Sequence, residues 1–202
     1  LITDAGTPGI SDPGEELVAM CCEAGIEVTS LPGAAACITA LTLSGLPTRR
    51  FAFEAFLPSD KKERACILQE LKNETRTIIL YEAPHRLVKM LEELYAELGD
   101  RKISLCRELT KKHETVFRDT LSQAIAWYKE NPPKGECVMV LAGRPREELV
   151  LEERQKWENM SLEEHLAIYE KEGMSRKDAM KQVAKDRGIR KRDVYQALLN
   201  QE

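Results

Sequence analysis

Two short stretches of this chain bring together side chains that often carry out acid–base and phosphate chemistry. YEAPHR (81–86) and RELTKKHE (107–114) are both rich in Glu, His, Lys and Arg. A carboxylate can take a proton from a hydroxyl group, whereas Lys and Arg bind phosphate oxygens. We therefore predict a substrate-binding cluster, with an ion-pair network at a sheet edge as the alternative for any single residue. The candidates for catalysis, which the residues alone do not rank, are Glu82, Glu108, Lys111 and Glu114.

Two loops rich in Gly, Pro and Ala offer room for a ligand. DAGTPG (4–9) follows the apolar start of the chain, and PGAAA (32–36) ends the strand-like IEVTSLP (26–32). Neither loop matches the Walker A or the G-x-G-x-x-G pattern. Such loops present backbone groups and permit close approach, which suits a neutral or zwitterionic ligand with an adenine-like ring. The alternative for the first loop alone is a rigid turn that starts a helix.

The elements that would position these motifs alternate between strand-like and helix-like patterns. Strands are expected at 1–3, 26–32, 51–57, 77–83, 102–109, 114–121 and 135–143. Helices are expected at 34–46, 61–73, 84–99 (with Pro84 in its first turn) and 121–131. This alternation predicts an α/β sheet with helices on its faces. Because ligands bind beyond the carboxyl ends of strands in such sheets, we expect four exits, at 4–9, 32–36, 81–86 and 107–114, to converge on one cleft.

From residue 144 the chain becomes highly charged and helical in pattern. Residues 146–161 are expected to form a linker or an exposed helix, and three amphipathic helices follow at 162–173, 175–188 and 191–199. Ser175 is expected to cap the second helix, and Gly188 to end it. The last helix is expected to pack through Val194, Tyr195, Leu198 and Leu199. Two short helices joined by a glycine turn predict a helix-turn-helix-like module.

Charge and composition narrow the choice of partners. The net charge is −4, yet residues 174–195 contain eight Lys or Arg against three Asp. A basic segment in an acidic chain favours nucleic-acid phosphates as its partner, and a solvated helical surface is the alternative. Hydrophobic residues make up 43% of the chain, and no apolar run approaches the roughly 20 residues that span a bilayer, so we expect no membrane partner.

The cysteines and histidines do not form a metal-binding pattern. The six cysteines lie in apolar surroundings without a C-x-x-C pair, at positions 21, 22, 37, 66, 106 and 137. This pattern indicates buried thiols in a reducing cytosol rather than disulfides or zinc ligands. Since His85, His113 and His165 are not at metal-ligand spacing, we expect no metal.

The ordered motifs also carry a family resemblance. DAGTPGISDPG, LPGAAACITALTLSGLP, YEAPHR, RELTKKHE and GECVMVLAG resemble the tetrapyrrole-methylase-like (class III) S-adenosylmethionine-dependent methyltransferases. Within that fold they look like the ribosomal RNA small subunit methyltransferase I family. The implied fold class is α/β, a two-subdomain sandwich followed by a small all-α, helix-turn-helix-like module. Members of the family begin with a further strand and a T-P-I-G-N-like loop that this sequence lacks, so we expect an incomplete N-terminal part.

The resemblance implies a domain layout and a reaction. Residues 1–47 would be the remainder of a cofactor-binding subdomain, 48–145 a second α/β subdomain, 146–161 a linker and 162–202 an RNA-binding module. S-adenosylmethionine would donate a methyl group to a cytidine 2′-oxygen of small-subunit (16S) ribosomal RNA, leaving S-adenosylhomocysteine. A cytoplasmic homodimer is implied as well. Two other classes remain open: a methyltransferase of tetrapyrrole precursors, and a non-catalytic RNA-binding protein.

The resemblance also assigns site residues to the matching motifs. One carboxylate among the catalytic candidates would take the hydroxyl proton, or Lys111 would stabilise the developing alkoxide. The cofactor-binding residues would be Asp4, Ala5, Gly6, Thr7, Gly33, Ala34, Ala35, Ala36, Tyr81, Glu82, Arg107, Glu108, Leu109, Gly135 and Glu136. The RNA-binding residues would be His85, Arg86, Lys111, Lys112, Arg176, Lys177, Arg190, Lys191 and Arg192.

Overall fold

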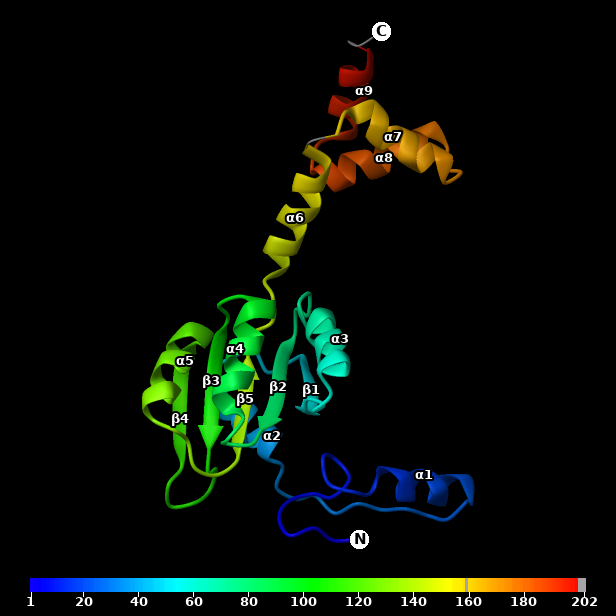
Figure 1. Ribbon diagram of the computed structural model, residues 1–202. Helices are drawn as coiled ribbons and strands as arrows, with labels where there is room; N and C mark the ends of the chain where they lie inside the picture. Colours follow the sequence, from blue (N-terminus) through cyan, green and yellow to red (C-terminus); the bar gives the residue numbers. More distant parts are fainter. Residues whose placement is uncertain (159, 200–202) are drawn as a thin grey trace. The chain divides into compact units, whose positions relative to one another are not determined.

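The computed structural model describes residues 1–158 and 160–199 of the chain (Figure 1). They form two compact units, one spanning Leu1–Arg144 and the other beginning at Pro145. Within the described residues, no helix is both long and apolar enough to cross a membrane. The predicted packing of the Leu199 side chain, and residues 200–202 of the predicted module, lie outside the described part.

The first unit is built on a five-stranded mixed sheet with the order β1-β2-β5-β3-β4. Its strands are β1 (Phe51–Phe56), β2 (Thr77–Glu82), β3 (Lys102–Arg107), β4 (Thr115–Thr120) and β5 (Cys137–Leu141). β1 and β2 are parallel, and β5 is antiparallel to both β2 and β3. The carboxyl ends of β1, β2 and β3 therefore share one edge of the sheet with the start of β5, where Glu82 and Arg107 both pair with Cys137.

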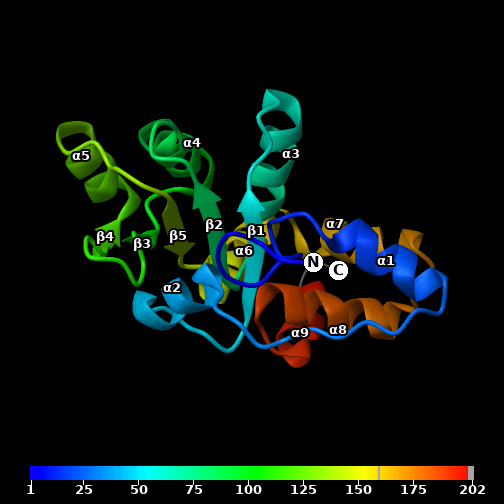
Figure 2. The ribbon, with the colours of Figure 1, turned by 90° about the horizontal axis from the view of Figure 1, so that it is seen from below.

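Helices cover both faces of this sheet, as Figure 2 shows: α3, α4 and α5 lie on one face and α2 on the other. Their bounds are α2 (Ala36–Ser44), α3 (Lys61–Leu71), α4 (Leu87–Leu98) and α5 (Leu121–Glu130). Because successive strand residues point to opposite faces, Ile78 and Leu80 pack under α3–α5, whereas Ile79 and Tyr81 pack under α2. The predicted α/β sheet is confirmed. Pro84, however, precedes α4 instead of lying in its first turn.

Two predicted strands do not form. Residues 1–3 and 26–32 lack strand structure, and the helix between them, α1 (Glu15–Glu23), has no buried residue. Ile2 and Leu31 are 93% and 83% exposed. A strand needs a hydrogen-bonded neighbour, and among the described residues these segments have none beside them. The prediction of strands at 1–3 and 26–32 was therefore wrong.

The second unit is entirely helical within its described residues. It comprises α6 (Arg146–Glu158), α7 (Leu162–Lys171), α8 (Arg176–Arg187) and α9 (Lys191–Leu199). Ser161 forms a capping box on α7, Ser175 caps α8, and Gly188 ends α8 in the left-handed conformation. The three amphipathic helices are confirmed, and of the two predictions for 146–161 the exposed helix is the one observed.

The core of the second unit corrects one prediction. Leu166, Val183 and Val194 are buried at its centre together with Ala179, Ala184 and Leu198. Tyr195 is 53% exposed and not part of this core, although we expected it there. In a helix, residue 195 lies about 100° around the axis from Val194, so the two side chains face different ways.

The cysteine prediction was also only partly right. Cys37, Cys106 and Cys137 are buried, but Cys22 and Cys66 are exposed and Cys21 is intermediate. All six are free thiols. Cys22 lies on α1, which has no buried residue, and Cys66 lies on the exposed side of α3, so an apolar sequence neighbourhood did not produce burial there.

Candidate functional site

A cavity of about 490 Å³ lies at the carboxyl edge of the sheet, on the face covered by α2. Its wall combines the glycine-rich loop after residue 3, the first turn of α2, the ends of β1 and β2, the exit of β3 and the start of β5. The predicted cofactor residues that line it are Asp4, Ala5, Gly6, Thr7, Ala34, Ala35, Ala36, Tyr81, Glu108, Leu109 and Glu136. The four strand exits were expected to meet here, and three of the four, all but 81–86, contribute several residues each.

The two glycine-rich loops hold each other through backbone contacts. The amide and the hydroxyl group of Thr7 donate to the carbonyl oxygen of Ala34, at 2.9 and 3.1 Å. Gly6 has φ +81°, and a Cβ added there would lie 2.9 Å from the same oxygen. Only glycine fits a position with both that conformation and that contact. The loops therefore form one preorganised, backbone-lined wall.

Tyr81 connects the end of β2 to the first turn of α2. Its phenolic oxygen accepts a hydrogen bond from the amide of Cys37 at 3.0 Å. Phe53 and Phe56 pack edge-on against its ring, with centroids 5.1 and 5.5 Å away. Burial, and then the contact with Cys37, raise the pKa of the phenol well above its ordinary value, which keeps it protonated. Tyr81 therefore acts as a fixed wall of the cavity.

The β3–β4 loop places a carboxylate and an amine side by side. Glu108 and Thr110 adopt positive φ angles of 52° and 63°, so the loop turns back over the cavity. The Glu108 carboxylate, 23% exposed, packs against Gly135 and lies 3.4 Å from Lys111 Nζ. Glu108 and Lys111 both line the cavity. This pair is the arrangement in the described site best suited to move a proton and to stabilise a developing negative charge.

Other predicted site residues lie outside the cavity wall. Glu82 is 1% exposed on the opposite face, where its Oε1 accepts from the Ala83 amide at 2.8 Å and lies 3.5 Å from Arg86 Nε. Arg107 also faces that side and donates to Thr115 Oγ1 and to the Lys134 carbonyl. Strand alternation explains both placements. Glu82 follows Tyr81 and Arg107 follows Cys106, and in each pair the first residue faces the cavity while the second faces the other side of the sheet.

The remaining predictions have supporting or peripheral positions. Gly33 lies behind Thr7, and Gly135 lies under Glu108, so both shape the wall without lining it. The Glu114 carboxylate accepts from the Thr110 amide at 2.7 Å, which holds the loop closed. His85 and Lys112 are exposed outside the cavity.

Sequence reasoning missed several residues of the wall. Thr3, Ile10, Ser11, Asp12, Thr39, Phe56, Cys106, Thr110, Cys137 and Val138 also line the cavity. Helical spacing places Thr39 one turn after Ala35, and this signal was available from the sequence. Asp12, which accepts from Thr3 Oγ1 at 3.0 Å, stands in the quoted DAGTPGISDPG motif. Its place in the wall depends on how the loop folds back.

The electrostatics of the cavity favour a ligand that carries positive charge. Among the described residues of the lining, four are acidic (Asp4, Asp12, Glu108 and Glu136) and one, Lys111, is basic. Burial raises the pKa of the nearby Cys137 thiol to about 12, so it stays protonated and uncharged. Within the described residues, no group of three or more His, Cys, Asp or Glu could hold a metal ion.

The predicted RNA-binding residues of the second unit lie at its surface. Arg176 and Lys177 begin α8 and are exposed, as are Arg190, Lys191 and Arg192 before and in α9. Arg190 is engaged by Asp193, with Nε 3.0 Å from Oδ2. Arg187, in contrast, points inward and donates to His165 Nδ1 and to the Met160 carbonyl.

Comparisons with known proteins agree with this arrangement. The model of the tetrapyrrole (corrin/porphyrin) methylases matches residues 1–125. The chain is 48% identical to a ribosomal RNA small subunit methyltransferase I from Synechocystis sp., covering 100% of this chain and 71% of that protein. It is 46% identical to the protein of the same name from Bacillus subtilis, covering 98% and 67%.

Solved structures share the fold at low sequence identity. A methyltransferase CobJ matches with a TM-score of 0.51 and 21% identity, covering 68% of this chain and 62% of that one. A diphthine synthase matches with a TM-score of 0.53 and 17% identity, covering 68% and 57%. The chain thus spans less than two thirds of these two structures, and the likeness concerns the fold alone.

Proposed function

Because this chain belongs to the ribosomal RNA small subunit methyltransferase I family, within the tetrapyrrole methylases, we propose that it transfers a methyl group from S-adenosylmethionine to a cytidine 2′-oxygen of small-subunit ribosomal RNA. The family resemblance expected from the motifs is confirmed at this level. The observation that carries the proposal is the backbone-lined, acidic cavity at the strand ends, with the Glu108–Lys111 pair in its wall.

The cavity fits the donor in size and in chemistry. Its volume of about 490 Å³ falls within the range of roughly 300–1,000 Å³ typical of small-molecule sites. Carboxylates complement the positive charges of a sulfonium and an ammonium group, and the glycine-rich loops allow a flat ring to approach the backbone. The first turn of α2 offers amide donors and a positive dipole end to a carboxylate. When bound, S-adenosylmethionine supplies an electrophilic methyl group.

The chain's own residues then have a positioning and a proton-transfer task. A ribose hydroxyl is a weak nucleophile, and it reacts faster when a nearby base takes its proton. We assign that role to the Glu108 carboxylate, which the positive-φ loop and Gly135 hold at the cavity. Lys111 Nζ, 3.4 Å away, stabilises the oxygen as its negative charge develops. Glu82, paired with Arg86 on the other face, positions the arginine instead.

The second unit supplies affinity for the acceptor. On α9, the half-exposed Tyr195 lies four residues after Lys191 and three after Arg192, so its ring shares a helical face with both basic side chains. A basic face with an exposed aromatic ring binds phosphates and stacks a base. Among α8 residues, Lys177, Lys181 and Lys185 form an exposed stripe at four-residue spacing.

The proposal includes a homodimer that acts in the cytoplasm, where its ribosomal RNA would be found.

Two measurements test the proposal on the full-length protein. Calorimetric titration with S-adenosylhomocysteine should show binding, and Ala36→Trp, which fills the cavity from the exposed start of α2, should abolish it. Thr42→Trp adds the same ring to the exposed side of α2 outside the cavity and should leave binding intact. Transfer of a labelled methyl group to small-subunit ribosomal RNA, lost in Glu108→Gln but largely kept in Glu114→Gln, should locate the base.

The possible outcomes separate the candidate functions. Binding of S-adenosylhomocysteine without methyl transfer to the RNA would refute the assigned acceptor and favour a small-molecule methyltransferase. RNA binding without S-adenosylhomocysteine binding would favour a non-catalytic RNA-binding protein. Nuclease mapping of the methylated nucleotide decides whether the oxygen belongs to a cytidine ribose.

A further inference from the structure

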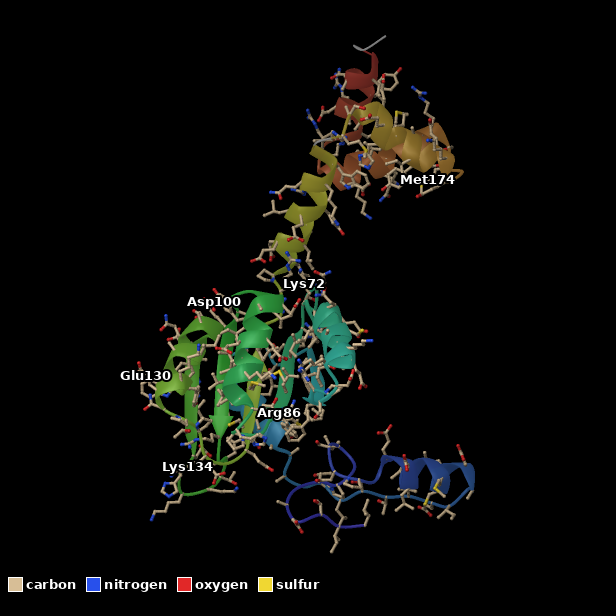
Figure 3. All side chains as sticks on the ribbon, in the orientation of Figure 1. Lys72, Arg86, Asp100, Glu130, Lys134 and Met174 are labelled. Atoms are coloured by element: carbon tan, nitrogen blue, oxygen red, sulfur yellow. The ribbon has the colours of Figure 1, made fainter. Side chains whose placement is uncertain are left out.

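A second recess lies at the same edge of the sheet, on the opposite face from the donor cavity. Its volume is about 260 Å³, and it is lined by Ser59, Lys61, Arg64, Arg86, Lys89, Met90 and Glu93. Ser59 follows β1 and Arg86 follows β2, and these two strands also contribute Phe56 and Tyr81, at or next to their ends, to the lining of the donor cavity. Figure 3 shows Arg86 at this end of the sheet, with Lys72 at the other end.

The recess carries an excess of positive charge. Four cations line it against one carboxylate, Glu93. That carboxylate is engaged by Arg64 through both oxygens, at 2.7 and 3.3 Å. Lys61 and Lys89 are exposed, and no ion pair joins either to a carboxylate within the described residues. The Asp60 carboxylate is turned to the backbone amides of its own helix.

The floor of the recess is a rigid structure. Arg64 is 7% exposed and donates to the carbonyl groups of Pro58 and Ser59 at 2.8 and 3.0 Å, as well as to Glu93. It therefore ties the loop after β1 to α4. Arg86 lies between Glu82, 3.5 Å away, and the Ser59 hydroxyl, 3.4 Å away. The recess is thus preorganised, because these contacts hold Arg86 and the loop after β1 in place before an anion binds.

The spacing of the basic residues on α3 and at the start of α4 lets their side chains line the same recess. Lys61 and Arg64 are three residues apart on α3. Lys89 and Glu93 of α4 follow its N-cap residue, Arg86, at successive spacings of three and four residues. Lys and Arg groups that converge on a small polar recess are the usual partners of a phosphate group. The hydroxyl of Ser59 adds a donor of the kind that commonly contacts nucleic-acid phosphates.

We propose that this recess binds a backbone phosphate of the RNA acceptor, held by Lys61, Lys89 and Arg86. The inference rests on the proposed function, because RNA crossing the strand ends is the ligand that would reach both the recess and the donor cavity. It adds Lys61 and Lys89, on α3 and α4, to the acceptor site. Phosphate contacts of this kind set the position of the strand and carry no sequence preference.

The test compares two variants of the full chain that lose the same charge. Lys61→Ala/Lys89→Ala empties the recess of its exposed lysines. Lys62→Ala/Lys72→Ala removes one exposed lysine in the first turn of α3 and one at its C-cap, both outside the recess. Affinity for a mixed-sequence single-stranded RNA 20-mer is measured by fluorescence anisotropy from 50 to 300 mM KCl, and S-adenosylhomocysteine binding is measured alongside.

We expect the recess variant to bind the RNA roughly tenfold more weakly than the parent at low salt. Its log–log salt slope should fall by about 0.7 for the lost phosphate contact. The control variant should keep most of the affinity and slope, and both should bind S-adenosylhomocysteine as the parent does. Inorganic phosphate at millimolar concentration should compete with RNA in the parent and less in the recess variant.

Equal RNA affinity and slope in the two variants would overturn the inference, as would failure of the parent to bind this RNA. Neither result depends on the methyl-transfer assay, which tests the proposed function separately. A parent that binds RNA through the recess but transfers no methyl group would refute the proposed function and leave the phosphate site standing. If Lys61→Ala/Lys89→Ala also lost S-adenosylhomocysteine binding, Lys61→Gln/Lys89→Gln would replace it in the same comparison.

Discussion

The phenolic oxygen of Tyr81 accepts a hydrogen bond from the backbone amide of Cys37 at 3.0 Å. This bond satisfies one of the amides that a helix leaves unpaired in its first turn, and it fixes α2 to the end of β2. Tyr81 lines the donor cavity, and so does Ala36, the residue before Cys37. The geometry of the cavity therefore depends on one side chain from the strand.

Tyr81→Phe should weaken both stability and donor binding. The Cys37 amide would remain buried without its partner, which typically costs about 1–3 kcal/mol of unfolding free energy. S-adenosylhomocysteine affinity should fall as the first turn of α2 loosens. Urea denaturation and calorimetry measure the two effects. Tyr95→Phe, at a 43% exposed tyrosine of α4, is the matched control and should change neither. A Tyr81→Phe protein as stable as the parent would contradict the role of this bond.

Gly135→Ala should damage catalysis more than donor binding. Gly135 has φ +80°, and an added Cβ would overlap the Glu108 carboxylate, which must then leave its position beside Lys111. The methyl-transfer rate should drop strongly. The backbone strain of a left-handed alanine alone costs about 1–2 kcal/mol of stability.

Gly99→Ala is the control that distinguishes backbone strain from displacement of the Glu108 side chain. Gly99 has the same φ of +80°, but no atom lies within 4 Å of an added Cβ. Gly99→Ala should therefore lose stability through backbone strain while keeping the methyl-transfer rate. Equal rates in the two glycine variants would show that the position of Glu108 does not matter.

The second unit should lose stability in mild acid. His165 is fully buried, stacked on Trp157 with centroids 3.8 Å apart, and accepts a hydrogen bond from Arg187. Burial, and then the charge of Arg187, lower its pKa, although Asp186 partly opposes the shift. The unfolded chain then binds the proton more tightly, so this contribution to stability is complete above the ordinary histidine pKa of about 6.5 and declines below it.

Urea unfolding at a series of pH values measures this effect. The fluorescence of Trp157, followed in a Trp127→Phe background, reports on the second unit. His165→Gln should flatten the decline below pH 6.5, whereas His113→Gln, at an exposed loop histidine, should keep it. A decline of the same size in both variants would assign the acid sensitivity to other groups.

Tyr195→Ala should weaken RNA binding without unfolding the second unit. The ring is 53% exposed on α9, and stacking on one base contributes about 1–3 kcal/mol to single-strand binding. Tyr195→Phe keeps the ring and should bind normally. Val194→Ala, at a fully buried neighbour, should lower stability instead. Anisotropy with the RNA 20-mer and thermal unfolding distinguish these outcomes.

Much of the fold could be predicted because its signals are local. The apolar run of β2, the glycine that ends α2 and the Ser175 cap are each set by neighbours in sequence. The apolar residues of segment 26–32 also predicted a strand, yet Ile26 and Leu31 stay exposed. Strand formation there depends on a pairing partner, which a local pattern does not contain.

The cavity wall was predictable in its loops and less so in its side-chain directions. Gly6 and Ala34–Ala36 line the cavity as their small size suggested. Tyr81 and Glu82 were both assigned to the donor, but one faces the cavity and the other faces Arg86. Alternate residues of a strand face opposite sides of the sheet, but the sequence does not tell which set faces the cavity. The structure shows this, because Ile79, two residues before Tyr81, packs under α2.

The alternation of β2 also has a consequence for how this protein can change over generations. Tyr81 and the donor cavity lie on one side of the sheet, and Glu82, Arg86 and the cationic recess lie on the other. Mutations at Lys61 or Lys89 can therefore alter how tightly an RNA strand is held while the lining of the donor cavity stays as it was. Two adjacent residues of one strand, Tyr81 and Glu82, thus belong to two surfaces that can evolve separately.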